Sequence, residues 1–224
     1  MNVIVSDIEG TLTTGSSWQA LRTYYKTHFN PRAYNLFFIR WVPRYLLVKL
    51  GLRSRRDAMF DWMLDEVQLF KGMSPLEFDK MAEWVVETEM WPKRRRDVLS
   101  ALEDHRGAGT QILVVSSAYH PIVAAFARRM EADPDGVTPI GSHLVLEDGC
   151  ITGIAQPLNA YEHKAAAVLA HLRAPESEEI SIIAAYGDTA SDIPMMELSE
   201  SPVAVYPDFE LRRIAETRGW QIIE

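Results

Sequence analysis

Cysteine is almost absent from this chain of 224 residues, in which Cys150 is the single one. A lone thiol has no partner for an internal disulfide, so we expect a protein of a reducing compartment, the cytoplasm, with Cys150 as a small buried apolar residue. The N-terminus lacks a basic start, a long apolar stretch and a cleavage site, so no secretory signal is expected. The most apolar window, residues 36–52, is interrupted by three basic residues and a proline, which argues against a membrane-spanning helix.

Acidic residues are missing from residues 10–56, although they are in excess overall. The chain has 31 Asp and Glu against 23 Lys and Arg, a formal net charge of −8, yet nine of the basic residues lie in that segment. The overall acidity argues against a nucleic-acid binder, whose domains usually carry a basic face. The basic segment predicts either recruitment of an anionic ligand or pairing with the acidic residues that follow it.

The remaining composition is ordinary for a globular protein, with 47% apolar and 24% charged residues. From residue 92 onward, short apolar runs alternate with segments of helical periodicity, which is typical of a mainly parallel sheet covered by helices on both faces. An α/β fold is therefore predicted. Strands are expected near residues 3–5, 111–115, 137–140, 180–185 and 203–205, a hairpin over 144–151, and helices over 93–105, 161–172 and 209–218.

A block of helical periodicity separates the first predicted strand from the second. Apolar residues recur at intervals of three and four between residues 18 and 90, which predicts four helices, with a kink or break at Pro43. The chain is therefore predicted to divide into a core domain, residues 1–15 and 92–224, and an inserted helical-bundle domain, residues 16–91.

Polar side chains stand at the ends of the predicted strands, where ligands bind in open parallel sheets. They are Asp7, Glu9 and Thr11 after the first strand, Ser116 and Ser117 after the second, Lys164 near a helix start, and Asp188, Ser191 and Asp192 after the strand over 180–185. Each alone has an ordinary explanation, such as a turn or a helix cap. Together, carboxylates from two strand ends, a hydroxyl and an ammonium are the groups that Mg²⁺-assisted phosphoryl transfer needs.

In their order, these motifs resemble those of the haloacid dehalogenase-like phosphatase superfamily: Asp-x-Asp-x-Thr, a strand-end Ser or Thr, a Lys, and Gly-Asp-x-x-x-Asp. The insertion between the first and second motifs is similar to that of the phosphoserine-phosphatase-like branch. The resemblance covers essentially the whole chain. It implies a three-layer Rossmannoid core with an inserted α-helical cap, and a Mg²⁺-dependent hydrolase that cleaves a small phosphorylated metabolite through an aspartyl-phosphate intermediate.

The resemblance also implies a role for each matching residue. Asp7 would be the nucleophile and a Mg²⁺ ligand, and Glu9 would be the general acid and base and a further metal ligand through its carbonyl. Ser116 would donate to the phosphoryl group, and Lys164 would neutralise charge between the two steps. The rest of the set is Asp188 and Asp192 for the metal, and Thr11, Ser117 and Ser191 for the substrate phosphate.

Glu9 departs from the family pattern, because most relatives carry Asp at this position. The extra methylene moves the carboxyl by roughly 1.5 Å, and a misplacement of about 1 Å can cost about 10²-fold in rate. A catalytically weakened ligand-binding or regulatory protein of the same fold is therefore one alternative. Against it, the enolase-phosphatases of methionine salvage are similar in carrying Asp-Ile-Glu-Gly-Thr, which favours a working Glu9.

A second departure concerns the substrate. Phosphoserine phosphatases place a Glu nine residues after the nucleophile, and here that position is Ser16, which weakens phosphoserine as the substrate. The basic segment favours an anionic leaving group, although its cations have the ordinary explanation of solvating helix faces or pairing with later acids. The candidate substrate-binding residues in it are Arg22, Arg40, Arg44 and Arg53.

The aromatic and basic window over residues 37–47 leaves a further alternative, a lipid-phosphate phosphatase at a membrane surface. Packing within the helical insertion is the ordinary explanation of that window. A serine hydrolase is poorly supported, because Ser116 and Ser117 lack the Gly-x-Ser-x-Gly elbow. Halide removal is disfavoured because the second acidic motif predicts a metal. The expected partner is thus a small phosphorylated substrate rather than nucleic acid, and no oligomeric state is predicted.

Overall fold

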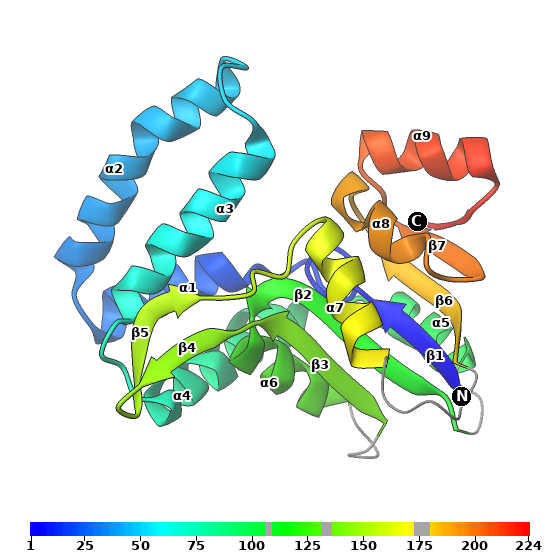
Figure 1. Ribbon diagram of the computed structural model, residues 1–224, viewed down its shortest axis with the longest axis horizontal. Helices are drawn as coiled ribbons and strands as arrows, with labels where there is room; N and C mark the ends of the chain where they lie inside the picture. The colour runs from blue at the N-terminus through cyan, green and yellow to red at the C-terminus, as the bar shows by residue number, and fades with distance from the viewer. Residues whose placement is uncertain (106–108, 131–135, 173–179) are drawn as a thin grey trace.

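The computed structural model describes residues 1–105, 109–130, 136–172 and 180–224. Within these residues, six parallel strands form one sheet in the order β3-β2-β1-β6-β7-β8, which confirms the predicted α/β class (Figure 1). The strands are β1 (Asn2–Ser6), β2 (Gln111–Tyr119), β3 (Val137–Ser142), β6 (Ser181–Gly187), β7 (Ser201–Val205) and β8 (Gln221–Ile223). The three-residue edge strand β8 is absent from the sequence-based prediction.

Helices cover both faces of the sheet because alternate strand residues point in opposite directions. Val3 and Val5 of β1 pack in one apolar cluster with residues of α7, α8 and α9. Ile4, between them, packs in a second cluster with residues of α5 and α6. The helices are α5 (Arg96–His105), α6 (His120–Met130), α7 (Glu162–Leu172), α8 (Ile193–Met196) and α9 (Phe209–Arg218).

The segment from Ser17 to Lys93, called the helical insert below, carries four α-helices, as predicted from its periodicity. They are α1 (Ser17–His28), α2 (Pro31–Lys49), α3 (Arg55–Glu66) and α4 (Pro75–Val85), followed by short turns of other helix types at Val67–Phe70, Val86–Met90 and Trp91–Lys93. The expected break at Pro43 is wrong, since α2 continues through it. Contacts with α3 on both sides of the proline offset the lost backbone hydrogen bond, through Trp41 against Trp62 and Arg44 against Asp65.

The insert is attached to the sheet at its base and projects at its tip (Figure 1). Tyr25 of α1 and Phe78 of α4 belong to the same apolar cluster as Ile4 of β1 and Phe126 of α6. The antiparallel pair α2 and α3 extends away from this shared core. Among the described residues, no helix combines the length and the apolarity needed to cross a membrane.

A two-stranded hairpin, β4 (Leu144–Glu147) and β5 (Cys150–Ala155), extends from the core to the insert. Its turn places Asp148 and Gly149 at positive φ, the backbone that a two-residue hairpin turn requires. Ile151 exchanges backbone hydrogen bonds of 2.8 Å with Gly72 and Met73 of the insert. Cys150 lies at the start of β5, in a two-stranded sheet separate from the six-stranded one, and is half-buried rather than buried.

Candidate active site

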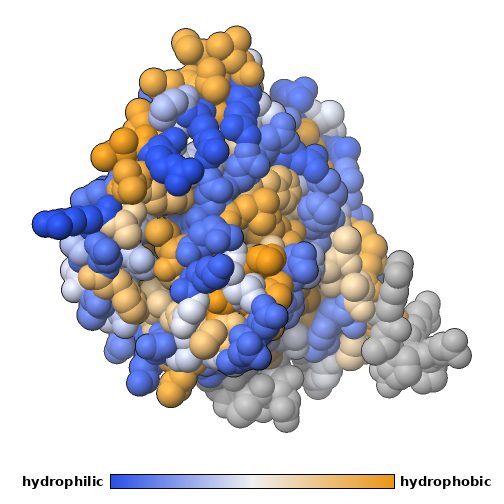
Figure 2. All heavy atoms as spheres, turned by 60° about the vertical axis from the view of Figure 1, so that its left-hand side comes forward, coloured by the Kyte–Doolittle hydropathy of each residue, from blue (hydrophilic) through white to orange (hydrophobic). Residues whose placement is uncertain are grey.

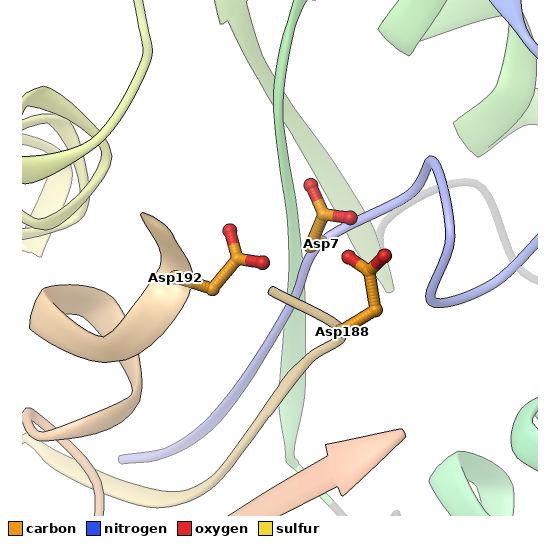
Figure 3. Close-up of side chains that lie close together, drawn as sticks. All are labelled: Asp7, Asp188 and Asp192. Atoms are coloured by element: carbon orange, nitrogen blue, oxygen red, sulfur yellow. The ribbon is translucent and has the colours of Figure 1, made fainter. Parts of the chain in front are cut away.

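The ends of two neighbouring strands bring the first and last acidic motifs together. β1 and β6 are adjacent and parallel, and the backbone N–H of Asp7 donates to the carbonyl of Tyr186 at 3.0 Å. Asp7 therefore follows β1, and Asp188 follows β6, at the same edge of the sheet. Figure 3 shows their carboxylates turned toward each other and toward Asp192, which ends the short helical turn Ala190–Asp192.

Lys164 lies between two of these carboxylates. It is the third residue of α7, and only 6% of its surface is exposed. Its Nζ donates to Oδ1 of Asp7 and to Oδ1 of Asp192, at 2.6 Å in each case. Burial alone would lower the pKa of Lys164, but the charges of Asp192 and Asp7 outweigh it and hold the pKa above its ordinary value. The ammonium therefore stays charged.

The acidic side chains lie close together and carry more negative charge than Lys164 can neutralise. One oxygen from each of Asp7, Asp188 and Asp192 lies within 4.8 Å of the other two. Burial raises the pKa of Asp7, against the opposing effect of Lys164, and burial together with the charges of Asp7 and Asp192 raises the pKa of Asp188. Oδ2 of Asp7 is buried without a hydrogen-bond partner. An oxygen-seeking divalent cation would satisfy both the orphaned oxygen and the excess negative charge.

The loop after β1 is shaped around Asp188. Gly10 adopts a φ of +93°, and a Cβ on it would lie 1.9 Å from Oδ2 of Asp188, so only glycine fits there. Thr11 is fully buried, and its hydroxyl donates to Oδ1 of Asp188 at 3.4 Å. This arrangement makes Thr11 a support for a candidate metal ligand.

Glu9 is held at the start of the insert. Its Oε1 accepts from the backbone N–H of Ser17 at 2.7 Å, and its Oε2 accepts from the hydroxyl of the same residue at 2.9 Å. Glu9 thus supplies the acceptor for the first turn of α1, which the N-cap residue Ser16 leaves without a side-chain cap. Burial raises the pKa of Glu9, and the two bonds from Ser17 oppose that rise.

Ser116 and Ser117 lie inside β2, which runs past its predicted end at Val115 to Tyr119. The Ser116 side chain is buried, and its Oγ accepts from the backbone N–H of Ala118 at 3.2 Å. Asn159, which sequence reasoning missed, donates to the carbonyl of Ser116 at 3.2 Å and fixes this segment. No motif precedes Asn159, so only its buried position identifies it.

The candidate arginines of the insert lie away from the acidic cluster. Arg44 pairs with Asp65 at 2.6 Å, Arg53 pairs with Asp61, and Arg22 lies 4.9 Å above the ring of Phe38. Arg40 is exposed on α2. Arg44 and Arg53 thus follow the ordinary explanation for basic residues in this segment, pairing with later acids, because α3 is rich in acidic residues and faces α2. Ser191 is half-buried, and its hydroxyl shares a 2.7 Å hydrogen bond with that of Thr189.

A cavity of about 830 Å³ adjoins the site between α1, α2 and α3. Glu9 and Ser117 line its inner end, and Arg55 is the basic residue that lines it. Glu66 also lines it, with one carboxylate oxygen buried and unpartnered. The sequence did not single out Arg55 or Glu66 as site residues, because their spacing is that of any amphipathic helix.

Residues 4–197 match the family of haloacid dehalogenase-like hydrolases. The chain belongs to this family. The chain is 29% identical over 226 residues to phosphoserine phosphatase SerB1 of Mycobacterium tuberculosis, and the match covers 96% of this chain and 68% of that protein. It is 35% identical over 128 residues to the inhibition of morphological differentiation protein of Streptomyces azureus, covering 57% of this chain and 45% of that protein.

The haloacid dehalogenase-like fold is shared with a solved structure, a protein of unknown function from Bordetella pertussis Tohama I. The two superpose with a TM-score of 0.78 at 22% identity, covering 100% of this chain and 98% of that one. The matches span less than half the length of several curated relatives, between 40% and 45% of each. The family membership therefore rests on the matched hydrolase segment.

Proposed function

We propose that this protein is a Mg²⁺-dependent phosphomonoesterase in which Asp7 forms an aspartyl-phosphate intermediate. The observation that carries the proposal is the state of the Asp7 carboxylate. One oxygen is fixed by Lys164 at 2.6 Å, the other is buried and unpartnered, and one oxygen of this carboxylate lies within 4.8 Å of oxygens of Asp188 and Asp192. A nucleophile held this way is oriented without its second oxygen being consumed by the protein. The phosphatase named among the relatives supports the same reaction class.

The residues present fit a magnesium site. Asp7, Asp188 and the backbone carbonyl of Glu9 would be direct ligands, with Asp192 holding a bound water or orienting Lys164. Mg²⁺ takes oxygen ligands and retains waters, which suits a cluster of three carboxylates of which one, Asp188, is only half-buried. When bound, it would neutralise the phosphate oxygens and the carboxylates that face them.

The proposed chemistry has two steps. In the first, an Oδ of Asp7 bonds to phosphorus, the ester P–O bond breaks, and the departing oxygen takes a proton from Glu9. In the second, Glu9 takes a proton from water as the water oxygen bonds to phosphorus, which releases phosphate and restores the Asp7 carboxylate. Burial raises the pKa of Glu9, which supports its holding a proton for the first step.

Lys164 supports both steps by staying charged beside Asp7 and Asp192. It would balance the charge that phosphate brings, while Ser116 and the backbone N–H of Ser117 would bind the phosphoryl oxygens. We propose further that residues 16–91 act as a cap over this site and that the half-buried, unpaired Cys150 reflects a reducing, cytoplasmic environment.

One observation favours a second candidate, a ligand-binding protein of the same fold. Glu9 already accepts two hydrogen bonds from Ser17, so its carboxylate also has a structural role that would persist without turnover. In that case phosphate esters would bind but would not be hydrolysed.

Turnover of p-nitrophenyl phosphate with Mg²⁺ distinguishes the two. We expect hydrolysis by the wild type, its loss with EDTA, its recovery on adding Mg²⁺, and its abolition by Asp7→Asn. The matched control is Asp79→Asn, an exposed position on α4, which should leave the rate unchanged. Binding without turnover by the folded wild type would establish the second candidate, and activity surviving Asp7→Asn would exclude Asp7 as the nucleophile.

A further inference from the structure

The cavity beside the site is walled by two helix faces. On α2 its lining residues recur from Phe38 to Val48, and on α3 from Arg55 to Glu66, at helical spacing on the sides that face each other. The two faces touch where the rings of Trp41 and Trp62 lie 5.2 Å apart. The α2 face alone spans ten residue steps, roughly 15 Å of helix. The groove is therefore elongated.

The wall of this groove is apolar. Trp18, Val42, Tyr45, Met59 and Met63 are typical of it, and they come from three different helices. A phosphorylated sugar, nucleotide or amino acid would leave its hydroxyl and amino groups without partners along most of such a wall.

The ionisable side chains that line the groove either lie at its ends or are uncharged. Glu9 marks the inner end and Arg55 is the cation that lines it. Burial, and then the charge of Glu9, raises the pKa of Glu66 to about 8, so this side chain is mainly an uncharged acid at neutral pH. The inner end, beside Glu9 and Ser117, is where the leaving group of a phosphate ester on Asp7 would begin.

We propose that the groove between α2 and α3 binds the leaving group of the substrate, and that this group is an extended apolar alcohol, so that the substrate is an amphiphilic phosphomonoester. This inference rests on the proposed function, because the groove has meaning as a leaving-group site only if phosphate is cleaved at Asp7. Apolar lining, length and contact with Glu9 together specify a chain rather than a compact polar metabolite.

The outer end of the groove leads toward an exposed apolar tip. Leu46 and Leu47 near the end of α2 are 51% and 41% exposed, and Leu50 and Leu52 in the turn after it are 70% and 73% exposed. An orange group stands at the top of Figure 2, at the end of the molecule where Figure 1 shows the turn between α2 and α3. The same ester can reach the groove as a dissolved monomer or from a lipid surface touched by this tip, and the two sources give different results below.

The test is a series of n-alkyl phosphates from ethyl to octyl, each kept below its micellar concentration, with Mg²⁺. Each methylene that enters the groove should raise kcat/KM by up to about fourfold, the transfer of one CH₂ from water. At least about a tenfold rise from ethyl to octyl is expected. Equal kcat/KM values across the series would overturn the inference and leave the phosphatase function intact. Hydrolysis of p-nitrophenyl phosphate but of no alkyl ester would also overturn the inference, whereas hydrolysis of neither would mean that the proposed function itself fails.

A groove-filling variant separates binding from folding. Ala58→Trp places a large ring in the groove and should reduce the octyl-to-ethyl ratio of kcat/KM by at least about tenfold, which removes the chain-length dependence. Misfolding lowers both rates in proportion, so the rate on ethyl phosphate reports on folding; an unchanged ratio at the wild-type rate on ethyl phosphate would contradict the inference. The matched control is Ala170→Trp, on the exposed side of α7, which should keep the wild-type ratio.

A further experiment distinguishes the two sources of the ester. In it, dodecyl phosphate is presented to the enzyme in phosphatidylcholine vesicles. If the tip meets a lipid surface, Leu50→Glu lowers the vesicle rate at least about tenfold and leaves the rate on dissolved octyl phosphate unchanged. If the substrate is a dissolved amphiphile, Leu50→Glu changes neither rate. Both results support an apolar leaving group, whereas faster hydrolysis of ethyl phosphate than of either long-chain ester would refute it.

Discussion

Replacing Glu66 by Gln should make the protein more stable at alkaline pH. Glu66 ends α3 and is 3% exposed, and one of its carboxylate oxygens has no hydrogen-bond partner. Burial raises its pKa from the ordinary value of 4.5 to about 8. An acid whose pKa is raised by folding binds its proton more tightly in the folded protein, so the free energy of unfolding falls as the pH rises from 4.5 to about 8.

The size of the effect follows from the slope of that dependence. Each pH unit between the two pKa values removes about 1.4 kcal/mol from the free energy of unfolding. Between about pH 6 and about pH 8, Glu66 therefore costs the wild type about 2 kcal/mol, with the slope flattening as the folded pKa is reached. Glu66→Gln keeps the shape of the side chain but has no proton to lose. The variant should gain this amount relative to the wild type over that interval.

The assay is urea denaturation of both proteins across this pH range, with the difference between them as the readout. Asp7 and Asp188 also have raised pKa values, but both proteins retain them, so their effect cancels in the difference. Glu210→Gln, at an exposed position on α9, should differ from the wild type by an amount that does not change with pH. Parallel curves for the wild type and Glu66→Gln would mean that Glu66 is already ionised in the folded protein, and the reasoning would fail.

Two further predictions concern the acidic cluster. Lys164→Met leaves Asp7 and Asp192 buried without their cation and should lower the free energy of unfolding by about 3 kcal/mol. The control Lys93→Met removes the cation of an exposed pair and should lower it by less than about 1 kcal/mol. Equal losses for the two variants, measured by urea denaturation, would contradict a buried ion network. Gly10→Ala and Gly72→Ala both place a side chain at positive φ, at about 1 to 2 kcal/mol. Only Gly10→Ala also collides with Asp188, so it alone should abolish Mg²⁺-dependent hydrolysis, and an active Gly10→Ala enzyme would argue against Asp188 as a ligand.

The acidic cluster was predictable because the topology of a parallel sheet determines where strand ends lie. Asp7 and Asp188 follow separate apolar runs, and neighbouring parallel strands place such residues at one edge whatever the loops between them do. Lys164 needed one more condition, a helix that begins beside that edge, which α7 satisfies. These are consequences of periodicity and chain direction, both of which can be read from one sequence.

The groove was not predictable from the same information. Its walls come from α2 and α3, whose apolar positions are typical of packed helices, and periodicity does not say whether two apolar faces meet or remain apart. The arginines show the same limit at the level of charge. A run of cations is compatible with ligand binding or with ion pairs. The packing of α2 against α3 pairs Arg44 with Asp65, and the turn between the two helices pairs Arg53 with Asp61. The boundaries of the inserted domain, placed at residues 16 and 91 from the sequence, remain a prediction.

The helices that form the groove also contact both sides of the acidic cluster. Arg56 of α3 pairs with Glu162, two residues before Lys164, and the ring of Phe60 lies 6.0 Å from that of Tyr161. On the other side, Ser17 at the start of α1 holds Glu9. A chain lying in the groove therefore contacts helices whose ends position Glu9, the proposed general acid, and the helix that carries Lys164. Binding energy gained far from phosphorus can in this way stabilise the arrangement that the reaction requires, so an apolar leaving group would contribute to catalysis as well as to affinity.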